Sequence, residues 1–373
     1  MLLLNLSTLI NPVLLFLFFA MNLLIIDVNP FGMLTDVVKW TQYLSKQWNI
    51  SLLCFSSRNN YNTQPRAEDI KLIEVHNYTN RHLKAAVFIL RSFFLLLFYK
   101  GKVVIEYFPY CELLKCLFPR KAMMLDIRTM SVNPDDVIRN NANRRIRHAC
   151  KYFDKVTAIS EGVASQLGRA DVVVLPLGSD IMSSCPKIYN NGIRLLYIGI
   201  LTNRRIGDSI EGVVSFHTLN PSIPISYTII GYGAENEENH IRQLVKDLKA
   251  EDYVLFVGRK RHEQLSTYID NSNVGLSFVP MTDYFDFQPP TKTFEYCLSG
   301  LYCIATGTSA NREFISSANG VIIEDSPQGV LNGLTAYWHM SSHISEASIR
   351  KSLISFTWEN IVNRALVPVL SSL

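Results

Sequence analysis

The chain has 373 residues, of which 48% are hydrophobic and 18% are charged. Soluble domains carry about 25% charged residues, so the sequence is unusually apolar, and its composition excludes a disordered, collagen-like or coiled-coil protein. The formal net charge of +4 is too small to indicate the dense basic surface of a nucleic-acid-binding protein. At about 150 residues per domain, this length predicts two or three domains.

No charged side chain precedes Asp27, and residues 13–19 form a continuous apolar run. A secretory signal would carry Lys or Arg before this run, and Pro12 interrupts the apolar stretch that an anchor would need. We therefore expect residues 1–20 to be an apolar appendage, with a weak anchor as the alternative, and the folded chain to begin at Met21.

A second apolar segment spans residues 84–102 and is interrupted by Arg91. It is short for a membrane-spanning helix, which needs about 20 apolar residues. Either it is a helix that lies at a membrane interface, with its cations near anionic headgroups, or it is a core helix packed on a sheet. The flanking cations are Arg81, Lys84, Lys100 and Lys102.

The cysteines and acidic residues do not indicate a metal site. The seven cysteines are scattered, with no CxxC pair and no Cys/His ligand spacing, so we interpret them as small buried residues in a reducing compartment. Asp135 and Asp136 follow Pro134 at the start of a predicted helix, which is typical of helix N-terminal charge.

Short runs of Val, Ile and Leu alternate with longer periodic stretches, which predicts an α/β fold of two doubly wound, Rossmann-like halves that join near residue 185. The expected domains are 21–185 and 186–350. Ligands of such halves bind at the carboxyl ends of the strands, in the cleft between domains. The expected strands are 23–28, 50–55, 70–75, 102–108, 121–127, 155–159, 171–176, 193–200, 225–233, 253–258, 274–280, 302–307 and 320–325, with helices such as 33–47 and 135–152 between them.

Glycines at the expected strand ends would let the backbone approach an anionic ligand closely. Gly32 lies in a strand–turn–helix corner whose free N–H groups can face a phosphate. Gly199, Gly231 and Gly258-Arg259 end strands of the second half, where each either approaches a ligand or makes a tight turn. No GxGxxG motif is present, which removes the main support for a dinucleotide cofactor.

Arg204 and Arg205 follow the first strand of the second half. Two guanidinium groups there could clamp a diphosphate, because the planar fork of arginine binds phosphate oxygens bidentately. A pair of solvated loop arginines is the alternative, and without further context we would favour it.

The most specific stretch is QPPTKTFEYCLSG, residues 288–300. Two prolines stiffen a loop that leads into a helix predicted to start near Thr291. Thr291 and Lys292 would hold a phosphate at that helix N-terminus. Glu295 lies one turn further in and could bind the vicinal hydroxyls of a ribose, with a capping or solvent-facing glutamate as the alternative.

Seven segments, in order and covering nearly the whole chain from Met21, resemble family 4 glycosyltransferases of the GT-B fold. They are DVNPFG, DKVTAISEGVASQL…VVVLPLGSD, YIGILTNRRIGDSIEGV, TIIGYGAE, VLFVGRKRHEQLSTYIDNSNVGLSFVP, PPTKTFEYCLSGLYCIATG and FTWENIVNRAL. The resemblance implies a retaining transferase of the hexosyltransferase type, with a nucleotide-sugar donor on the second half, an acceptor on the first, and no metal or other cofactor. It also implies a C-terminal helix, 351–373, that returns to the first domain.

The resemblance also implies roles for single residues. Gly32 matches the glycine loop near the donor phosphates, and Arg204, with Arg205 beside it, matches the basic diphosphate clamp. Gly258-Arg259 matches the turn that edges the base. Glu295 matches the second glutamate of an E-x7-E motif, which holds the ribose.

This sequence departs from the motif at its first glutamate, because Phe287 stands eight positions before Glu295. The nearest carboxylate, Asp286, is one residue out of phase. We therefore expect the donor sugar to be contacted by backbone N–H groups near Gln288, or by Asp286 through a shifted loop.

On the acceptor side, Glu106, Asp126 and Arg128 follow strands that face the cleft. Asp126 or Glu106 could position an acceptor hydroxyl, and Arg128 could reach the diphosphate. A salt bridge between Arg128 and one of the two acids is the alternative. The basic stretch 139–151 is either a solvated helix face or a surface for anionic lipid.

The expected function is retaining transfer of a sugar to a glycan acceptor that is carried on a lipid, in the assembly of a surface polysaccharide such as lipopolysaccharide or capsule. Arg204, Arg205 and Lys292 would stabilise the departing diphosphate. The expected location is the cytoplasm, on the inner face of the membrane. The alternatives are a nucleotide-sugar 2-epimerase of GT-B fold and a non-catalytic binding subunit, which the missing glutamate favours.

Overall fold

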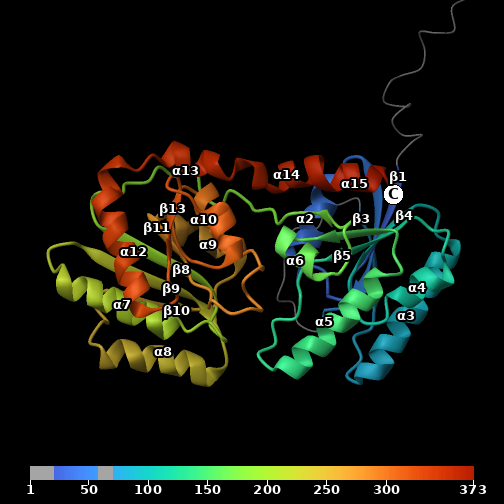
Figure 1. The fold of residues 1–373 in the computed structure, drawn as a ribbon, viewed down its shortest axis with the longest axis horizontal. Helices are drawn as coiled ribbons and strands as arrows, with labels where there is room; N and C mark the ends of the chain where they lie inside the picture. The colour runs from blue at the N-terminus through green and yellow to red at the C-terminus, as the bar shows by residue number, and fades with distance from the viewer. Residues whose placement is uncertain (1–20, 58–69) are drawn as a thin grey trace, which may run out of the picture.

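The computed structural model describes residues 21–57 and 70–373, so the predicted appendage at 1–20 lies outside the described residues. Within the described part, the chain forms two parallel sheets, each covered by helices, and the two Rossmann-like domains lie side by side (Figure 1). The predicted fold class of two doubly wound α/β halves is confirmed.

The sheet of the first domain has its described strands in the order β3-β2-β1-β4-β5-β6-β7. Its central strand β1 is fully buried from Leu23 to Ile26, because helices cover both faces of the sheet, and this explains the continuous apolar runs of the sequence. The strands are β1 (Met21–Ile26), β2 (Trp48–Phe55), β3 (Ile70–Val75), β4 (Lys102–Glu106), β5 (Met123–Ile127), β6 (Lys155–Ala158) and β7 (Val173–Val174).

The sheet of the second domain has the order β10-β9-β8-β11-β12-β13 within the described residues. Strand β11 ends earlier than predicted, at Ser277, and beyond it the Val279 N–H donates to the Thr306 side-chain hydroxyl of β12 (2.9 Å) and not to a backbone carbonyl of that strand. The strands are β8 (Ile193–Ile200), β9 (Ile225–Tyr232), β10 (Val254–Gly258), β11 (Val274–Ser277), β12 (Tyr302–Thr306) and β13 (Gly320–Ile323).

Helices cover both sheets, with α2, α14 and α15 on one side of the first sheet and α3, α4 and α5 on the other (Figure 1). The helices of the first domain are α2 (Thr35–Leu44), α3 (Arg81–Phe98), α4 (Glu112–Leu117), α5 (Asp136–Cys150) and α6 (Glu161–Gln166). Those that follow are α7 (Ile206–Leu219), α8 (Glu235–Asp247), α9 (Leu265–Asp270), α10 (Thr291–Leu298), α11 (Ser309–Phe314), α12 (Pro327–Met340), α13 (Glu346–Ser352), α14 (Trp358–Ile361), a π-helical turn (Val362–Leu366) and α15 (Val367–Ser371).

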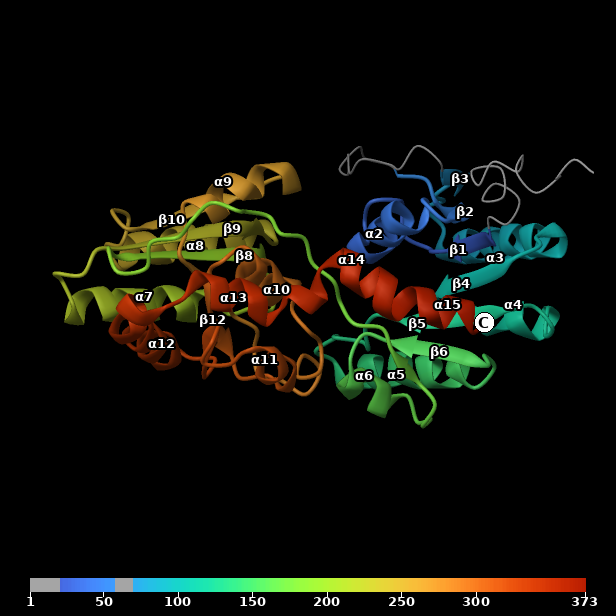
Figure 2. The same ribbon diagram turned by 90° about the horizontal axis from the view of Figure 1, so that it is seen from above.

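The end of the chain returns to the first domain, as the fold class predicts (Figure 2). Ser179 and Thr357 form a parallel backbone bridge, and the Trp358 N–H donates to the Ser179 carbonyl (3.1 Å). The Trp358 ring is 1% exposed and lies against Gly178, where a Cβ would collide with it. At the far end, the Lys102 ammonium donates to the Ser371 carbonyl (3.1 Å). The two domains are thus joined both by the connecting chain and by this returning helix.

Helix α3 contains most of the second apolar segment and has apolar side chains both on a buried face and on an exposed one. Phe88, Ser92 and Leu96 form a narrow buried stripe against the sheet. Other apolar side chains of the helix are exposed, including Phe94 (53%) and Phe98 (78%). None of the described helices is both long and apolar enough to cross a bilayer.

Candidate functional site

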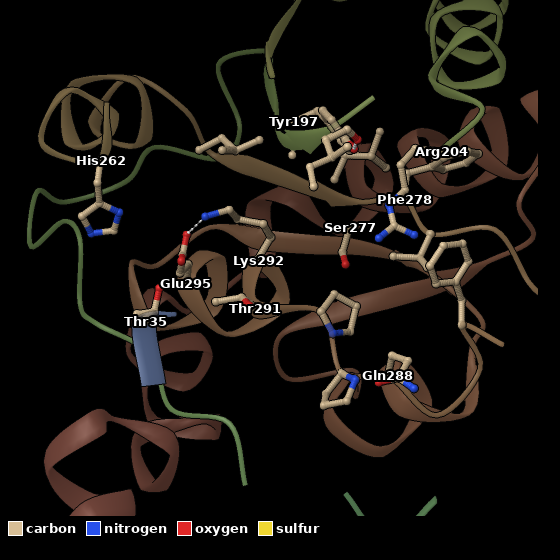
Figure 3. Close-up of a pocket in the computed structure, with 18 residues that line it drawn as sticks. Thr35, Tyr197, Arg204, His262, Ser277, Phe278, Gln288, Thr291, Lys292 and Glu295 are labelled. Atoms are coloured by element: carbon tan, nitrogen blue, oxygen red, sulfur yellow. Dashed lines mark hydrogen bonds and ion pairs between the residues drawn. The ribbon is translucent and has the colours of Figure 1, made fainter. Parts of the chain in front are cut away.

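A cavity of about 420 Å³ opens at the carboxyl ends of the second domain's strands (Figure 3). Its walls come from the end of β8, the end of β11, the loop before α10 and the first turn of α10, and Thr35 of α2 reaches it from the first domain. The predicted residues that line it are Gly199, Arg204, Gln288, Thr291, Lys292 and Glu295.

Arg204 lies on one side of this cavity, and the Lys292–Glu295 pair lies on the other, with Ser277 between them (Figure 3). The Arg204 guanidinium is 4.1 Å from the centre of the Phe285 ring, and its Nη1 is buried without a hydrogen-bond partner among the described residues. Burial lowers the pKa of Arg204, yet an arginine stays charged at neutral pH. A buried guanidinium nitrogen without a partner is costly, so an anion is the ligand that this position favours.

The two adjacent arginines are separated by the backbone of their loop. Asn203 and Arg205 both have left-handed φ values, of 56° and 53°, which is a strained conformation for residues other than glycine. The turn directs the Arg205 side chain out of the cavity, where it forms ion pairs with Asp208 and with Asp325, the second at 3.3 Å. The alternative prediction of a solvated loop arginine therefore applies to Arg205, whereas Arg204 lines the cavity.

Helix α10 starts at Thr291, as predicted, because Pro290 can precede a helix but cannot continue one. Glu295 is 6% exposed and forms an ion pair with Lys292, one turn before it. The glutamate therefore does not face solvent, and the pair presents an acceptor and a donor to the same cavity. The Thr293 hydroxyl fixes this helix in place: it donates to the Asn311 side-chain oxygen (2.8 Å) and can accept from the Ser277 hydroxyl at the end of β11 (2.8 Å).

The other predicted glycines lie near the site but do not line the cavity. Gly32 turns the chain before α2 with a left-handed φ of 91°. A Cβ at Gly231 would collide with the Gly199 carbonyl, so this glycine serves close packing between β8 and β9. Gly258 has a φ of 79°, and Arg259 stacks on the Tyr232 ring at 4.5 Å.

Sequence reasoning missed some residues of the cavity. Thr35 comes from the other domain, and His262 comes from a short helical turn after β10. The Tyr197 hydroxyl donates to the Ile200 carbonyl (2.8 Å) and shapes the turn below Gly199. Ser277 could have been predicted, because it is a polar residue at the end of a strand whose carboxyl end faces the cleft.

Phe287, which stands where the motif has its first glutamate, faces the first domain. The Phe287 ring lies against Gly162 at the start of α6, where a Cβ would collide with it. The Ser160 hydroxyl donates to the Phe287 carbonyl (2.9 Å) across the same contact. A further cross-domain contact places the Arg139 guanidinium 5.0 Å from the Tyr284 ring. The loop that walls the cavity is therefore also a contact between the domains.

Asp286 does not supply a carboxylate to the cavity, contrary to one of the two expectations for the sugar contact. Its oxygens accept hydrogen bonds from the N–H (2.8 Å) and the hydroxyl (2.6 Å) of Ser309, at the start of α11. The other expectation names backbone N–H groups near Gln288, but the Gln288 N–H donates to the Phe285 carbonyl (3.0 Å) and two prolines follow it, so Gln288 lines the cavity without a free N–H to offer.

The salt bridge that was the alternative for Arg128 is present in the structure. Arg128 forms an ion pair with Asp36 of α2 and lies 3.7 Å from the Asp126 carboxylate. Asp126 is fully buried and also accepts a hydrogen bond from the Thr157 hydroxyl (2.5 Å). Neither Asp126 nor Arg128 lines the cavity, so the structure places both in the framework of the first domain.

Two more acids share the edge of this sheet. Asp27 directly follows β1, and Glu106 ends β4, the next strand. Burial, together with the charge of Asp27, raises the pKa of Glu106 to about 11, and burial also raises that of Asp27. Glu106 is therefore a neutral acid at pH 7 that can donate a hydrogen bond to Asp27. Within the described residues, no group of three His, Cys, Asp or Glu side chains is placed to hold a metal ion.

No protein-family model matches the sequence, and no curated protein does either. Solved structures do share the architecture. Sucrose-phosphate synthase of Thermosynechococcus elongatus aligns over 95% of this chain and 100% of its own, with 14% identity and a TM-score of 0.75. HepE of Anabaena, in complex with UDP and glucose, has the same coverage with 13% identity and a TM-score of 0.71.

A third similar structure is the lipopolysaccharide outer core galactosyltransferase WaaB, with 17% identity, a TM-score of 0.68 and coverage of 95% of this chain and 100% of its own. The chain has the GT-B fold. At these identities the likeness concerns the fold, and the chemistry has to be argued from the residues of the cavity.

The protonated Glu106 of this GT-B chain predicts a pH dependence of stability. The folded chain keeps this proton at pH values where the unfolded chain, with the ordinary glutamate pKa near 4.5, has released it, so the free energy of unfolding falls as the pH rises above that value. Glu106→Gln, which needs no proton, should reduce this fall by up to about 1.4 kcal/mol per pH unit. Urea unfolding between pH 6 and pH 8 measures it, with the exposed Glu74→Gln as control. Equal slopes in wild type and Glu106→Gln would contradict the assignment.

Because Phe287 contacts Gly162, we expect the effect on stability of a substitution at one of these positions to depend on the residue at the other. Gly162→Ala should lower the free energy of unfolding by about 1–3 kcal/mol, because its Cβ overlaps the Phe287 ring. In the Phe287→Gly background, which also removes the Phe287 Cβ that would lie 2.7 Å from the new one, the same change should be neutral or stabilising, since alanine favours a helix over glycine by about 1 kcal/mol. A urea-unfolding double-mutant cycle measures the difference, and an identical effect in both backgrounds would show that the contact is absent.

Proposed function

We propose that this GT-B chain is a glycosyltransferase that moves a sugar, with retention at the anomeric carbon, from a nucleoside-diphosphate sugar to a glycan acceptor. The observation that carries the proposal is the half-buried Arg204, which lines the cavity and whose Nη1 is buried without a hydrogen-bond partner among the described residues. The solved structures of similar fold support it, because they include a galactosyltransferase and a complex with UDP and glucose.

The charges of the cavity suit a donor with a diphosphate in the middle. Glu295 would accept hydrogen bonds from ribose hydroxyls, and Lys292 beside it would contact the phosphate nearer the nucleoside. Arg204, on the opposite wall, would bind the phosphate that carries the sugar. Gln288 is the polar side chain of the loop that remains for the sugar itself.

In the proposed reaction, the bond between the anomeric carbon and the diphosphate oxygen breaks, and the acceptor oxygen bonds to that carbon from the same face. The departing nucleoside diphosphate takes the electron pair, and the acceptor proton leaves with it or to solvent. Negative charge grows on the oxygen nearest Arg204, so a fixed cation there stabilises the transition state more than the ground state. No bound metal is required for this charge balance.

A non-catalytic binding subunit is the second candidate, and a specific observation favours it. Phe287 replaces the first acid of the motif and packs on Gly162, and Asp286 is bonded to Ser309, so neither position presents a carboxylate to the cavity. Donor binding without transfer or hydrolysis would identify this alternative. Transfer by the purified chain would exclude it.

The two arginines of one loop provide the test of the proposed function. A thermal-shift panel of UDP, GDP, TDP and CMP sugars first identifies the donor, and release of its nucleotide then measures turnover. Arg204→Ala should lower kcat about 100- to 1,000-fold, as the loss of one transition-state donor does elsewhere. Arg205→Ala is the matched control and should stay within a few-fold of wild type, because its side chain is paired outside the cavity. Wild-type turnover in Arg204→Ala would overturn the role of this cation.

We also propose that the acceptor is lipid-linked and that the enzyme meets it on the cytoplasmic face of a membrane, in surface polysaccharide assembly. The exposed stripe of α3 supports this, because an apolar helix face flanked by cations suits an anionic bilayer surface. The stripe consists of Leu83, Leu90, Phe94, Leu97 and Phe98, and the neighbouring exposed cations are Arg81, Arg91 and Lys100.

The stripe on α3 predicts a specific loss of membrane binding. Phe94→Glu/Phe98→Glu should weaken binding to vesicles of phosphatidylcholine and phosphatidylglycerol at least tenfold in a flotation assay, because two apolar contacts become charged. Leu219→Glu/Leu255→Glu, at leucines of the second domain that are 68% and 59% exposed, is the matched control and should bind like wild type. Equal binding of the wild type to anionic and purely zwitterionic vesicles would contradict the proposal.

A further inference from the structure

A second polar cavity, of about 340 Å³, lies in the first domain between the turn that follows β4 and the helix α5. Tyr107 and Tyr110 line it from the turn, and Arg144, Arg145 and His148 line it from the helix. None of these side chains lines the donor cavity, and the mechanism above does not use them.

The cations of this cavity are poorly neutralised. The Arg145 side chain is exposed and has no hydrogen bond or ion pair with a side chain or carbonyl of the described residues. Arg144 donates to the Asn141 side chain (2.7 Å), which is neutral. Glu112, at the start of α4, is the acid among the lining residues, so positive charge exceeds negative charge. Both arginines line the same cavity, and a guanidinium group matches the oxygens of a phosphate.

The opposite wall is aromatic and held in a defined conformation. Tyr110 has a left-handed φ of 70°, which is costly for a residue with a large side chain, and its ring is 53% exposed. The turn is fixed by hydrogen bonds from the Cys111 N–H to the Phe108 carbonyl and from the Leu113 N–H to the Tyr110 carbonyl. The fold therefore maintains an exposed ring opposite the cations, as expected of a surface that contacts a sugar or a chain next to a phosphate.

The cavity borders the apolar surface of α3 and α4. Helix α4 begins at Glu112, which lines the cavity, and exposes Leu113 (46%) and Leu117 (57%). Helix α3 packs on this region, with the Phe93 ring 5.3 Å from the Phe118 ring. A ligand held here by Arg144 and Arg145 would have its anionic group at the cations and an apolar part beside α4.

We propose that this cavity binds the phosphate or diphosphate that joins the acceptor glycan to its lipid. The inference rests on the proposed glycosyltransferase function and specifies its acceptor: the phosphate contacts Arg144 and Arg145, the tyrosines contact the adjoining sugar, and the lipid leaves along α4 toward the membrane. Because Tyr107 directly follows Glu106 at the end of β4, the glycan can continue from here toward the cleft between the domains.

The test measures binding by calorimetry to the full chain carrying Arg204→Ala, so that the donor cavity does not compete for phosphate. The probes are geranyl diphosphate, which has both parts of the ligand, pyrophosphate, which lacks the chain, and geraniol, which lacks the phosphates. Geranyl diphosphate should bind at least tenfold more tightly than either fragment. Arg144→Gln/Arg145→Gln should weaken both diphosphates at least tenfold, and the exposed pair Lys46→Gln/Lys71→Gln should leave them unchanged. Glu112→Gln, which removes the acid, should tighten both a few-fold.

Two results would overturn the proposal. One is equal weakening by the two double variants, which would show unspecific attraction by surface charge. The other is binding of phosphatidylglycerol vesicles that depends on Arg144 and Arg145 while geranyl diphosphate does not bind, which would assign the cavity to bilayer headgroups. Failure of the proposed function is seen separately, because the nucleotide-sugar panel uses the wild-type chain and the other domain.

Discussion

The registered strand pairs of both sheets are parallel, and this single constraint places the chemistry of the molecule. Parallel strands bring every loop that follows a strand to one edge of the sheet. The chain places the two edges opposite each other and fixes them with its returning end, where Trp358 covers Gly178. The loop before α10 then spans the gap, with Gln288 in the cavity and Phe287 on Gly162. The shape of the donor cavity therefore depends on how the domains are held together.

The two edges differ in their electrostatics, and the difference fits their proposed ligands. The edge of the first domain gathers Asp27 and Glu106, and burial keeps Glu106 protonated. The edge of the second domain presents Arg204, a cation with no polar partner among the described residues. An anionic donor is drawn to the second edge, whereas the first is suited to hydroxyl groups, which a neutral acid can bind without placing a charge beside the reacting sugar.

Most of the fold could be predicted from the sequence, because strands buried on both faces are continuous apolar runs and Pro290 fixes the start of α10. The site was predictable where one segment contributes neighbouring residues, as with Thr291, Lys292 and Glu295. The site was not predictable where the role of a residue depends on distant contacts or on backbone angles. Arg204 and Arg205 are chemically identical, and left-handed residues on both sides decide which one faces the cavity. Asp36 pairs with Arg128 across 92 positions, which no local pattern encodes.

The low charge content of this chain is an average over regions that need different residues, such as buried strands and surface sites. The buried strands are nearly continuous apolar runs, whereas the stripe on α3 places apolar side chains on the surface. The small net charge of +4 similarly includes a neutralised acidic edge and an uncompensated basic cavity at Arg144 and Arg145. An apolar surface and a basic cavity that meet at α4 form a site for an amphiphilic anion. The mean hydropathy and the net charge are totals over the whole chain. Neither can reveal such a site, because the site depends on which apolar and charged side chains lie next to each other.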